Sequence, residues 1–147
     1  MRSGTLHRIL LIDDEPVIRE TVERALSDVY EIKSLPSGHD LDGLLRVFSP
    51  DLIILDIRMP DENGLLICSR LRQDRRFDSV PVIFLTALID EATVREGFAN
   101  GGDYYLSKPF NLQELSLVVR PSSAANISTR TKSSNADPAP AARACLI

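Results

Sequence analysis

The sequence has few cysteines and histidines and no long apolar run. Its two cysteines, Cys68 and Cys145, lie far apart among 147 residues, so no disulfide framework is indicated. No apolar run reaches the about 18 residues that a membrane-spanning helix needs, and residues 1–8 lack the apolar core of a signal peptide. Neither His7 nor His39 has a neighbour that would form a nucleophile–base pair. These absences predict a cytoplasmic protein with no contact to a membrane.

The net charge of −4 is unevenly distributed. Residues 1–120 carry 14 Lys and Arg against 20 Asp and Glu, a net of −6, whereas residues 121–147 carry a net of +2. Nucleic-acid binding requires a clustered basic face, so the acidic body argues against it. Residues 121–147 hold seven Ala, five Ser and three Pro and few large apolar side chains. We therefore expect one domain over residues 1–120 and a low-complexity, disordered tail or linker over residues 121–147.

Short apolar runs alternate with helical periodicity throughout residues 8–119. The runs predict strands at 8–12, 29–35, 51–56, 81–85 and 103–106. Between and after them, apolar residues recur at helical spacing, and a helix-compatible Pro16 and the Gly-rich Asn100-Gly101-Gly102 mark helix ends. Five strands that alternate with five helices predict an α/β fold with a doubly wound parallel sheet in three layers. We expect the flavodoxin-like strand order 2-1-3-4-5.

Polar residues follow the predicted strands at the edge where their carboxyl ends meet. Asp13 and Asp14 follow the first strand, Asp56 the third, Thr86 the fourth and Lys108 the fifth. Ligands of open parallel sheets bind outside this edge. Three clustered carboxylates would repel one another unless a cation joined them, and hard oxygen ligands suit Mg²⁺. The ammonium and the hydroxyl suit phosphoryl oxygens, and a carboxylate can act as a covalent nucleophile that forms an aspartyl phosphate.

This constellation resembles the receiver domain of bacterial two-component response regulators. The resemblance covers about Arg8 to Val119, and four motifs carry it in order. They are Asp13-Asp14; Asp56 with Met59-Pro60 and Gly64; Thr86-Ala87; and Lys108-Pro109-Phe110.

The resemblance implies a role for each of these residues. Asp56 would accept a phosphoryl group from a sensor histidine kinase or a phosphotransfer protein. Asp14, Asp56 and the main-chain carbonyl of Arg58 would bind Mg²⁺, with Asp13 acting through water. Lys108, Thr86 and Ala87 would contact the phosphoryl group, and the bond before Pro109 would be cis. Tyr105 stands at the switch position, from which the face of the fourth helix, fifth strand and fifth helix would be biased for signalling or homodimerisation.

Two residues depart from the common pattern of the family. Arg58 is bulky and basic, and Leu88 is apolar, at positions that border the path of the hydrolytic water. We therefore predict slow loss of the phosphoryl group.

Simpler interpretations exist for single residues. Asp13, Asp14 and Glu15 could cap a helix, Thr86 could be an N-cap, and Lys108 could be a solvated charge. Tyr105 could serve packing alone, and the stretch 72–76 reads as a solvated charged face.

Three functions compete. The first is a phosphoacceptor that catalyses only its own phosphorylation and dephosphorylation. The second is an aspartate-nucleophile phosphohydrolase, although Arg58 stands where such enzymes usually carry a second acid. The third is a scaffold that is never phosphorylated. A stand-alone regulator, a phosphorelay shuttle and the receiver of a longer protein are all compatible with this sequence.

Overall fold

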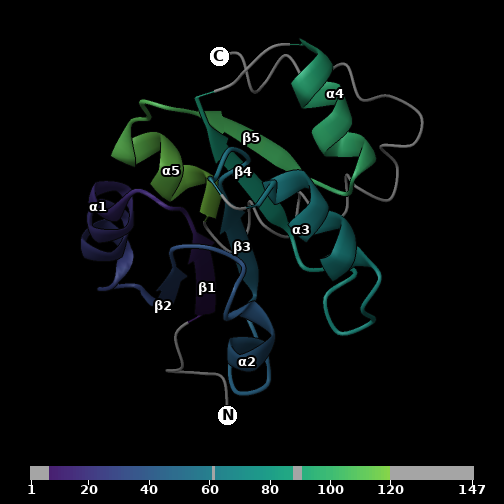
Figure 1. Ribbon diagram of the computed structural model, residues 1–147. Coiled ribbons are helices and arrows are strands. Elements are labelled where there is room, and N and C mark those ends of the chain that lie inside the picture. Colours follow the sequence, from purple (N-terminus) through teal and green to yellow (C-terminus); the bar gives the residue numbers. More distant parts are fainter. Residues whose placement is uncertain (1–6, 61, 88–90, 120–147) are drawn as a thin grey trace.

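Strands and helices alternate strictly along the chain (Figure 1). A computed structural model describes residues 7–60, 62–87 and 91–119. The strands are β1 (His7–Ile12), β2 (Tyr30–Leu35), β3 (Leu52–Leu55), β4 (Val82–Thr86) and β5 (Tyr104–Ser107). The helices are α1 (Pro16–Leu26), α2 (Leu41–Leu45), α3 (Gly64–Arg72), α4 (Glu91–Ala99) and α5 (Leu112–Val119). Leu88 and the segment 121–147, for which the sequence carried predictions, lie outside the described residues.

The strands form one parallel sheet in the order β2-β1-β3-β4-β5. This confirms the predicted fold class and strand order. The least apolar strand, β2, and the short β5 lie at the edges, whereas the fully buried β3 lies at the centre. All five carboxyl ends therefore meet at one edge, where the polar residues of the motifs lie.

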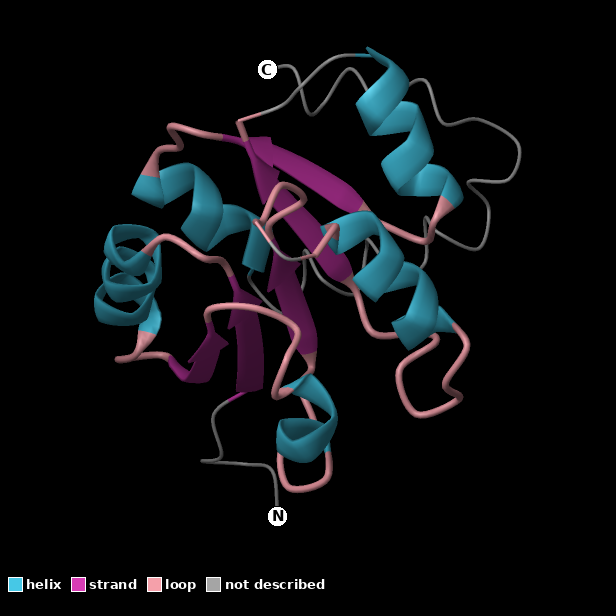
Figure 2. Ribbon diagram, in the orientation of Figure 1, coloured by secondary structure: helices cyan, strands magenta, loops and turns pink. Residues whose placement is uncertain are grey.

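Helices cover both faces of the sheet (Figures 1 and 2), and an apolar cluster packs between the sheet and the helices on each face. Successive side chains of a strand point to opposite faces, so Leu10 and Ile12 pack beneath α2, α3 and α4. Ile9 and Leu11 pack beneath α1 and α5. Because both faces are covered, the central strands need continuous apolar runs instead of alternating ones.

The helices differ from the sequence prediction in a few places. The structure ends α2 at Leu45, not beside Phe48, although the Phe48 side chain is still buried. Gly43, a poor helix former, lies within this short helix. Ala25 and Leu112 are exposed, although each shares a helix with buried apolar residues. None of the helices in the described ranges is long and apolar enough to span a membrane.

Gly101 and Gly64 occupy backbone positions that require glycine. Gly101 has a φ of 102° and ends α4, while the Gly101 and Gly102 N–H groups donate to the carbonyls of Phe98 and Gly97. This is the Schellman arrangement that the Gly-rich motif predicts. A Cβ at Gly64 would lie 2.1 Å from the main-chain oxygen of Asp56, so the loop after β3 can return to start α3 only with glycine there.

The charged stretch 72–76 is not a uniformly solvated face, so that prediction was wrong for Arg72. Its side chain is 17% exposed and binds the Asp103 carboxylate at 2.9 Å, and Asp103 is buried. The same guanidinium donates to the carbonyls of Phe77, Val80 and Gly101. Arg72 therefore ties the end of α3 to the chain segments that lead into β4 and β5.

Candidate functional site

The parallel pairing of β1 with β3 brings the acidic side chains together. The Asp56 N–H donates to the Ile12 carbonyl at 2.9 Å, which places Asp56 directly beside Asp13. Carboxylate oxygens of Asp13, Asp14 and Asp56 lie within 4.8 Å of one another. Asp13 and Asp56 are buried, and Asp14 is half-buried. Asp13 and Asp14 share the site because β1 ends at Ile12, so both acids belong to the loop that follows.

Lys108 reaches this group of acids from β5. Its N–H donates to the Thr86 carbonyl at 2.9 Å, so the main chain continues the pairing of β4 with β5 beyond Ser107. The ammonium lies 2.9 Å from Asp13, 3.4 Å from Asp56 and 2.6 Å from Glu15. The Lys108 side chain is only 13% exposed. It is therefore a largely buried partner of three carboxylates and not a solvated charge.

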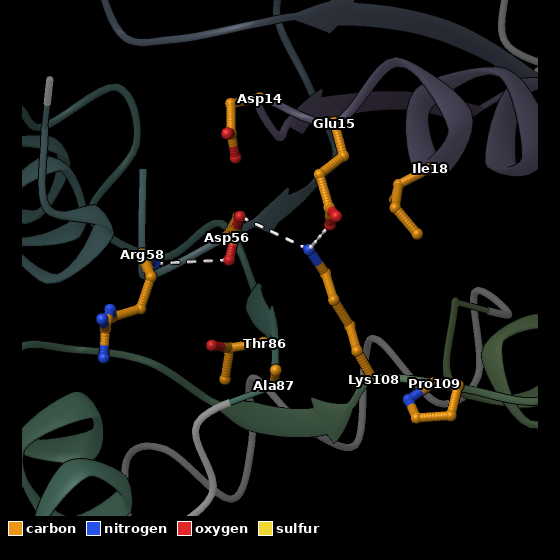
Figure 3. Close-up of a pocket in the computed structure, with 9 residues that line it drawn as sticks. All are labelled: Asp14, Glu15, Ile18, Asp56, Arg58, Thr86, Ala87, Lys108 and Pro109. Atoms are coloured by element: carbon orange, nitrogen blue, oxygen red, sulfur yellow. Dashed lines mark hydrogen bonds and ion pairs between the residues drawn. The ribbon is translucent and has the colours of Figure 1, made fainter. Parts of the chain in front are cut away.

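A pocket opens above these groups (Figure 3). Its lining includes Asp14, Asp56, Arg58, Thr86 and Lys108. Ala87, Pro109, Glu15 and Ile18 complete it. The Arg58 N–H donates to Asp56 Oδ1 at 3.3 Å, while its guanidinium points away from Asp56 in Figure 3. The hydroxyl-bearing side chain of Thr86 stands across the pocket from Lys108.

Burial and charge shift the protonation of this site. Burial raises the pKa of Asp56 to about 7, and the neighbouring Asp13 carboxylate adds to the rise, while Lys108 opposes it. Burial also raises the pKa of Asp13. For Lys108, burial alone would lower the pKa, but Glu15 and Asp13 more than offset it, so the pKa is raised. The cluster is thus short of positive charge at neutral pH, and a divalent cation would relieve the repulsion between its acids.

The donor set fits Mg²⁺. Three carboxylates converge, all the side-chain donors are hard oxygens, and the pocket leaves room for water to complete the coordination. Among the described residues that line the pocket there is no His or Cys, the ligand types that zinc prefers.

Tyr105 lies outside the pocket, beneath α4. Its side chain is fully buried, and its hydroxyl donates to the Thr93 carbonyl at 2.7 Å. The Lys108–Pro109 bond is cis, as the resemblance implies. The structure therefore brings Asp13, Asp14, Asp56, Thr86 and Lys108 to one place, whereas Tyr105 does not line that pocket.

Sequence reasoning missed the role of Glu15. It was considered only as part of a helix cap, yet as the residue before α1 it makes no side-chain cap hydrogen bond. Instead its carboxylate lies closer to the Lys108 ammonium than either Asp13 or Asp56 does. A signal was present, because Glu15 is the third consecutive acid at the edge that also holds Lys108.

The sequence matches the family described as response regulator receiver domain over residues 9–120. It is 40% identical over 114 residues to the DNA-binding dual master transcriptional regulator RpaA of Synechocystis sp.. This alignment covers 77% of this chain and 47% of RpaA. It is 41% identical over 108 residues to the transcriptional regulatory protein GltR of Pseudomonas aeruginosa. This alignment covers 73% of this chain and 45% of GltR. The chain spans about half the length of the curated relatives it matches.

Solved structures agree with the fold. The Vibrio cholerae chemotaxis protein CheY4 superposes with a TM-score of 0.75 at 28% identity, over 78% of this chain and 97% of that chain. The receiver domain of the Francisella response regulator 1452 gives a TM-score of 0.70 at 26% identity, over 85% of this chain and 98% of that chain.

Proposed function

The chain belongs to the response regulator receiver domain family, and from this premise we propose that Asp56 is the phosphoacceptor of a two-component signalling protein. One observation carries the proposal. Asp56 directly follows the central strand, and its carboxylate lies among the acids of the cluster, 3.4 Å from the Lys108 ammonium. These residues would supply a nucleophile, cation ligands and a counter-charge for phosphate at one place.

The transfer needs only one bond to form and one to break. An Asp56 carboxylate oxygen attacks the phosphorus of a phosphohistidine, and the phosphorus–nitrogen bond breaks with its electron pair leaving on the imidazole. Lys108 and the Thr86 hydroxyl lie on opposite sides of the pocket and would bind phosphoryl oxygens, together with the Ala87 main chain. The acyl phosphate so formed is the signal, and water later removes it.

Mg²⁺ is the cofactor that we propose for this step. Asp14, Asp56 and the Arg58 carbonyl would bind it directly, and Asp13 would do so through water. When bound, it supplies positive charge for the oxygens of the transferred group. We propose that the domain has no substrate beyond its own phosphodonors, since Arg58 occupies the place of the second acid of aspartate-nucleophile hydrolases. A lack of turnover on small phosphate esters would support this.

The donor would be a sensor histidine kinase or a phosphotransfer protein in the cytoplasm. We propose that the signal leaves through the face of α4, β5 and α5, which could also form a homodimer. The acidic charge of residues 1–120 supports a domain that does not itself bind nucleic acid. RpaA is a DNA-binding protein by name, but this chain matches only 47% of it.

Acetyl phosphate with Mg²⁺ tests the phosphoacceptor directly. Intact-protein mass spectrometry should find one added phosphoryl group on the wild-type chain and none on Asp56→Asn. Asp28→Asn is the matched control, because Asp28 is an exposed acid after α1, and this variant should be modified like the wild type. An unmodified wild type, or equal modification of Asp56→Asn, would overturn the assignment.

A further inference from the structure

Tyr105 is held in place by contacts on three sides. Its ring centroid lies 5.3 Å from that of Phe84 on β4 and 5.6 Å from that of Phe98 on α4. Its hydroxyl donates to the Thr93 carbonyl, 2.7 Å away on the same helix. The ring therefore occupies a fitted site between the sheet and α4.

That site exists because position 97 has no side chain. A Cβ at Gly97 would lie 2.0 Å from the Tyr105 hydroxyl oxygen and 2.7 Å from two ring carbons. Real Cβ atoms do not approach other atoms so closely. The glycine is not needed for its backbone, because Gly101 is the residue of positive φ among the described residues. Glycine within a helix makes the helix less stable than alanine would. The space that Gly97 leaves for the Tyr105 ring therefore explains why glycine is suited to this position.

The neighbouring ring has the same requirement. A Cβ at Gly102 would lie 2.2 Å from the Phe84 ring, and Gly102 donates its N–H to the Gly97 carbonyl at 2.9 Å. Gly43 of α2 is different, because a Cβ there would meet nothing within 4 Å. The close fit at Gly97 is thus not shared by Gly43, and it differs from that at Gly64, where a Cβ would meet the main-chain oxygen of Asp56 instead of an aromatic ring.

The same face of the sheet connects this site to the phosphoryl pocket. In the β4–β5 register, Phe84 pairs with Tyr105 and Thr86 with Ser107. Because alternate residues share a face, the side chains of Phe84 and Thr86 point the same way, toward α4. Thr86 and Tyr105 therefore lie on the same face of the sheet.

We propose that Gly97 is a positioning residue that sets where Tyr105 rests, and thereby the form of the α4–β5 surface that a partner meets. With glycine, the ring is accommodated beneath α4. Any side chain at position 97 pushes the ring toward solvent before any phosphoryl group arrives. The importance of this for signalling rests on the proposed function, but the packing relationship does not.

The test uses the full, unphosphorylated chain, so its outcome is independent of whether Asp56 accepts phosphate. The sequence contains three tyrosines and no tryptophan, so labelling with 3-fluorotyrosine gives a simple ¹⁹F NMR spectrum. The Tyr105→Phe variant identifies the resonance of residue 105. In Gly97→Ala the Tyr105 ring should become accessible to solvent, so its resonance should shift and be broadened by a soluble paramagnetic agent. The resonance of the buried Tyr30 should not change. Gly43→Ala should shift neither.

A double-mutant cycle keeps the proposal testable if Gly97→Ala is poorly stable. Overpacking should raise the equilibrium constant for unfolding about tenfold when Tyr105 is present. In a Tyr105→Leu background, Gly97→Ala should raise this constant much less, because the smaller leucine side chain leaves room for the added methyl group. An unmoved Tyr105 resonance in Gly97→Ala, or an equal loss of stability in both backgrounds, would overturn the proposal.

Discussion

The Lys108 ammonium lies 2.6 Å from the Glu15 carboxylate, closer than it lies to Asp13 at 2.9 Å. Asp56 is 3.4 Å from the same ammonium. The lysine at the pocket is therefore shared, and part of its charge is directed toward an acid that lies before α1. A phosphoryl group that arrives at Asp56 must compete with this contact.

Glu15→Gln should increase the rate of phosphorylation by acetyl phosphate. The substitution removes a negative charge near an anionic donor and frees Lys108 for Asp56. Glu15 is 55% exposed, so the contact is partly screened and the gain should be at most about fivefold. Phosphoprotein formation followed by mass spectrometry measures it. Glu20→Gln, a change to an exposed acid of α1, is the control and should leave the rate unaltered. A slower rate in Glu15→Gln would show that Glu15 assists the transfer.

Asp56 should make the metal-free protein less stable as the pH rises. Its pKa lies near 7 in the folded chain against 3.8 in an unfolded one, mainly because of burial. The folded state therefore holds its proton more tightly, and stability falls between about pH 4 and pH 7 as the unfolded state alone releases it. The loss is at most about 4 kcal/mol for about three pKa units. Urea denaturation in EDTA at a series of pH values measures the free energy of unfolding, and Asp56→Asn should not show this loss. If the free energies of the wild type and of Asp56→Asn changed in parallel with pH, the prediction would be refuted.

Magnesium should stabilise the folded chain. The three carboxylates that converge on the pocket are assembled only in the folded state, so Mg²⁺ at 100 times its dissociation constant should add about 2.7 kcal/mol to the free energy of unfolding. Thermal denaturation with and without Mg²⁺ measures this. Asp14→Asn should lose most of the gain, and Asp28→Asn should keep it. An equal response of both variants would place the metal elsewhere.

The fold could be predicted because strand ends obey simple rules. Continuous apolar runs such as the one before Asp56 specify a sheet that is buried on both faces, and parallel strands bring their carboxyl ends to one edge. Asp13, Asp56 and Lys108 therefore converge by topology alone, as the structure confirms. The short side chains of the acids leave little freedom about where their oxygens lie.

The remaining features depend on side chains whose direction the sequence does not specify. Arg72 and Glu15 are long and have many rotamers, so their choice of Asp103 and Lys108 follows from packing across distant elements. The space that Gly97 leaves for Tyr105 is likewise visible only once α4 is laid over β5. Sequence spacing could identify this glycine as unusual within a helix but could not name the ring that needs it.

Arg72→Met should destabilise the protein without changing its phosphoryl chemistry. The substitution removes the ion pair of the buried Asp103 carboxylate. It also removes the hydrogen bonds that the Arg72 side chain donates to main-chain carbonyls. Removing one partner of a buried pair costs about 3 kcal/mol or more, which urea denaturation at constant pH would measure. Arg76→Met is the matched control, since Arg76 and its partner Asp74 lie at the surface, and it should cost less than about 1 kcal/mol. Equal effects would mean that the Arg72 network adds nothing beyond a surface contact, whereas modification of Asp56 by acetyl phosphate should be the same in both variants.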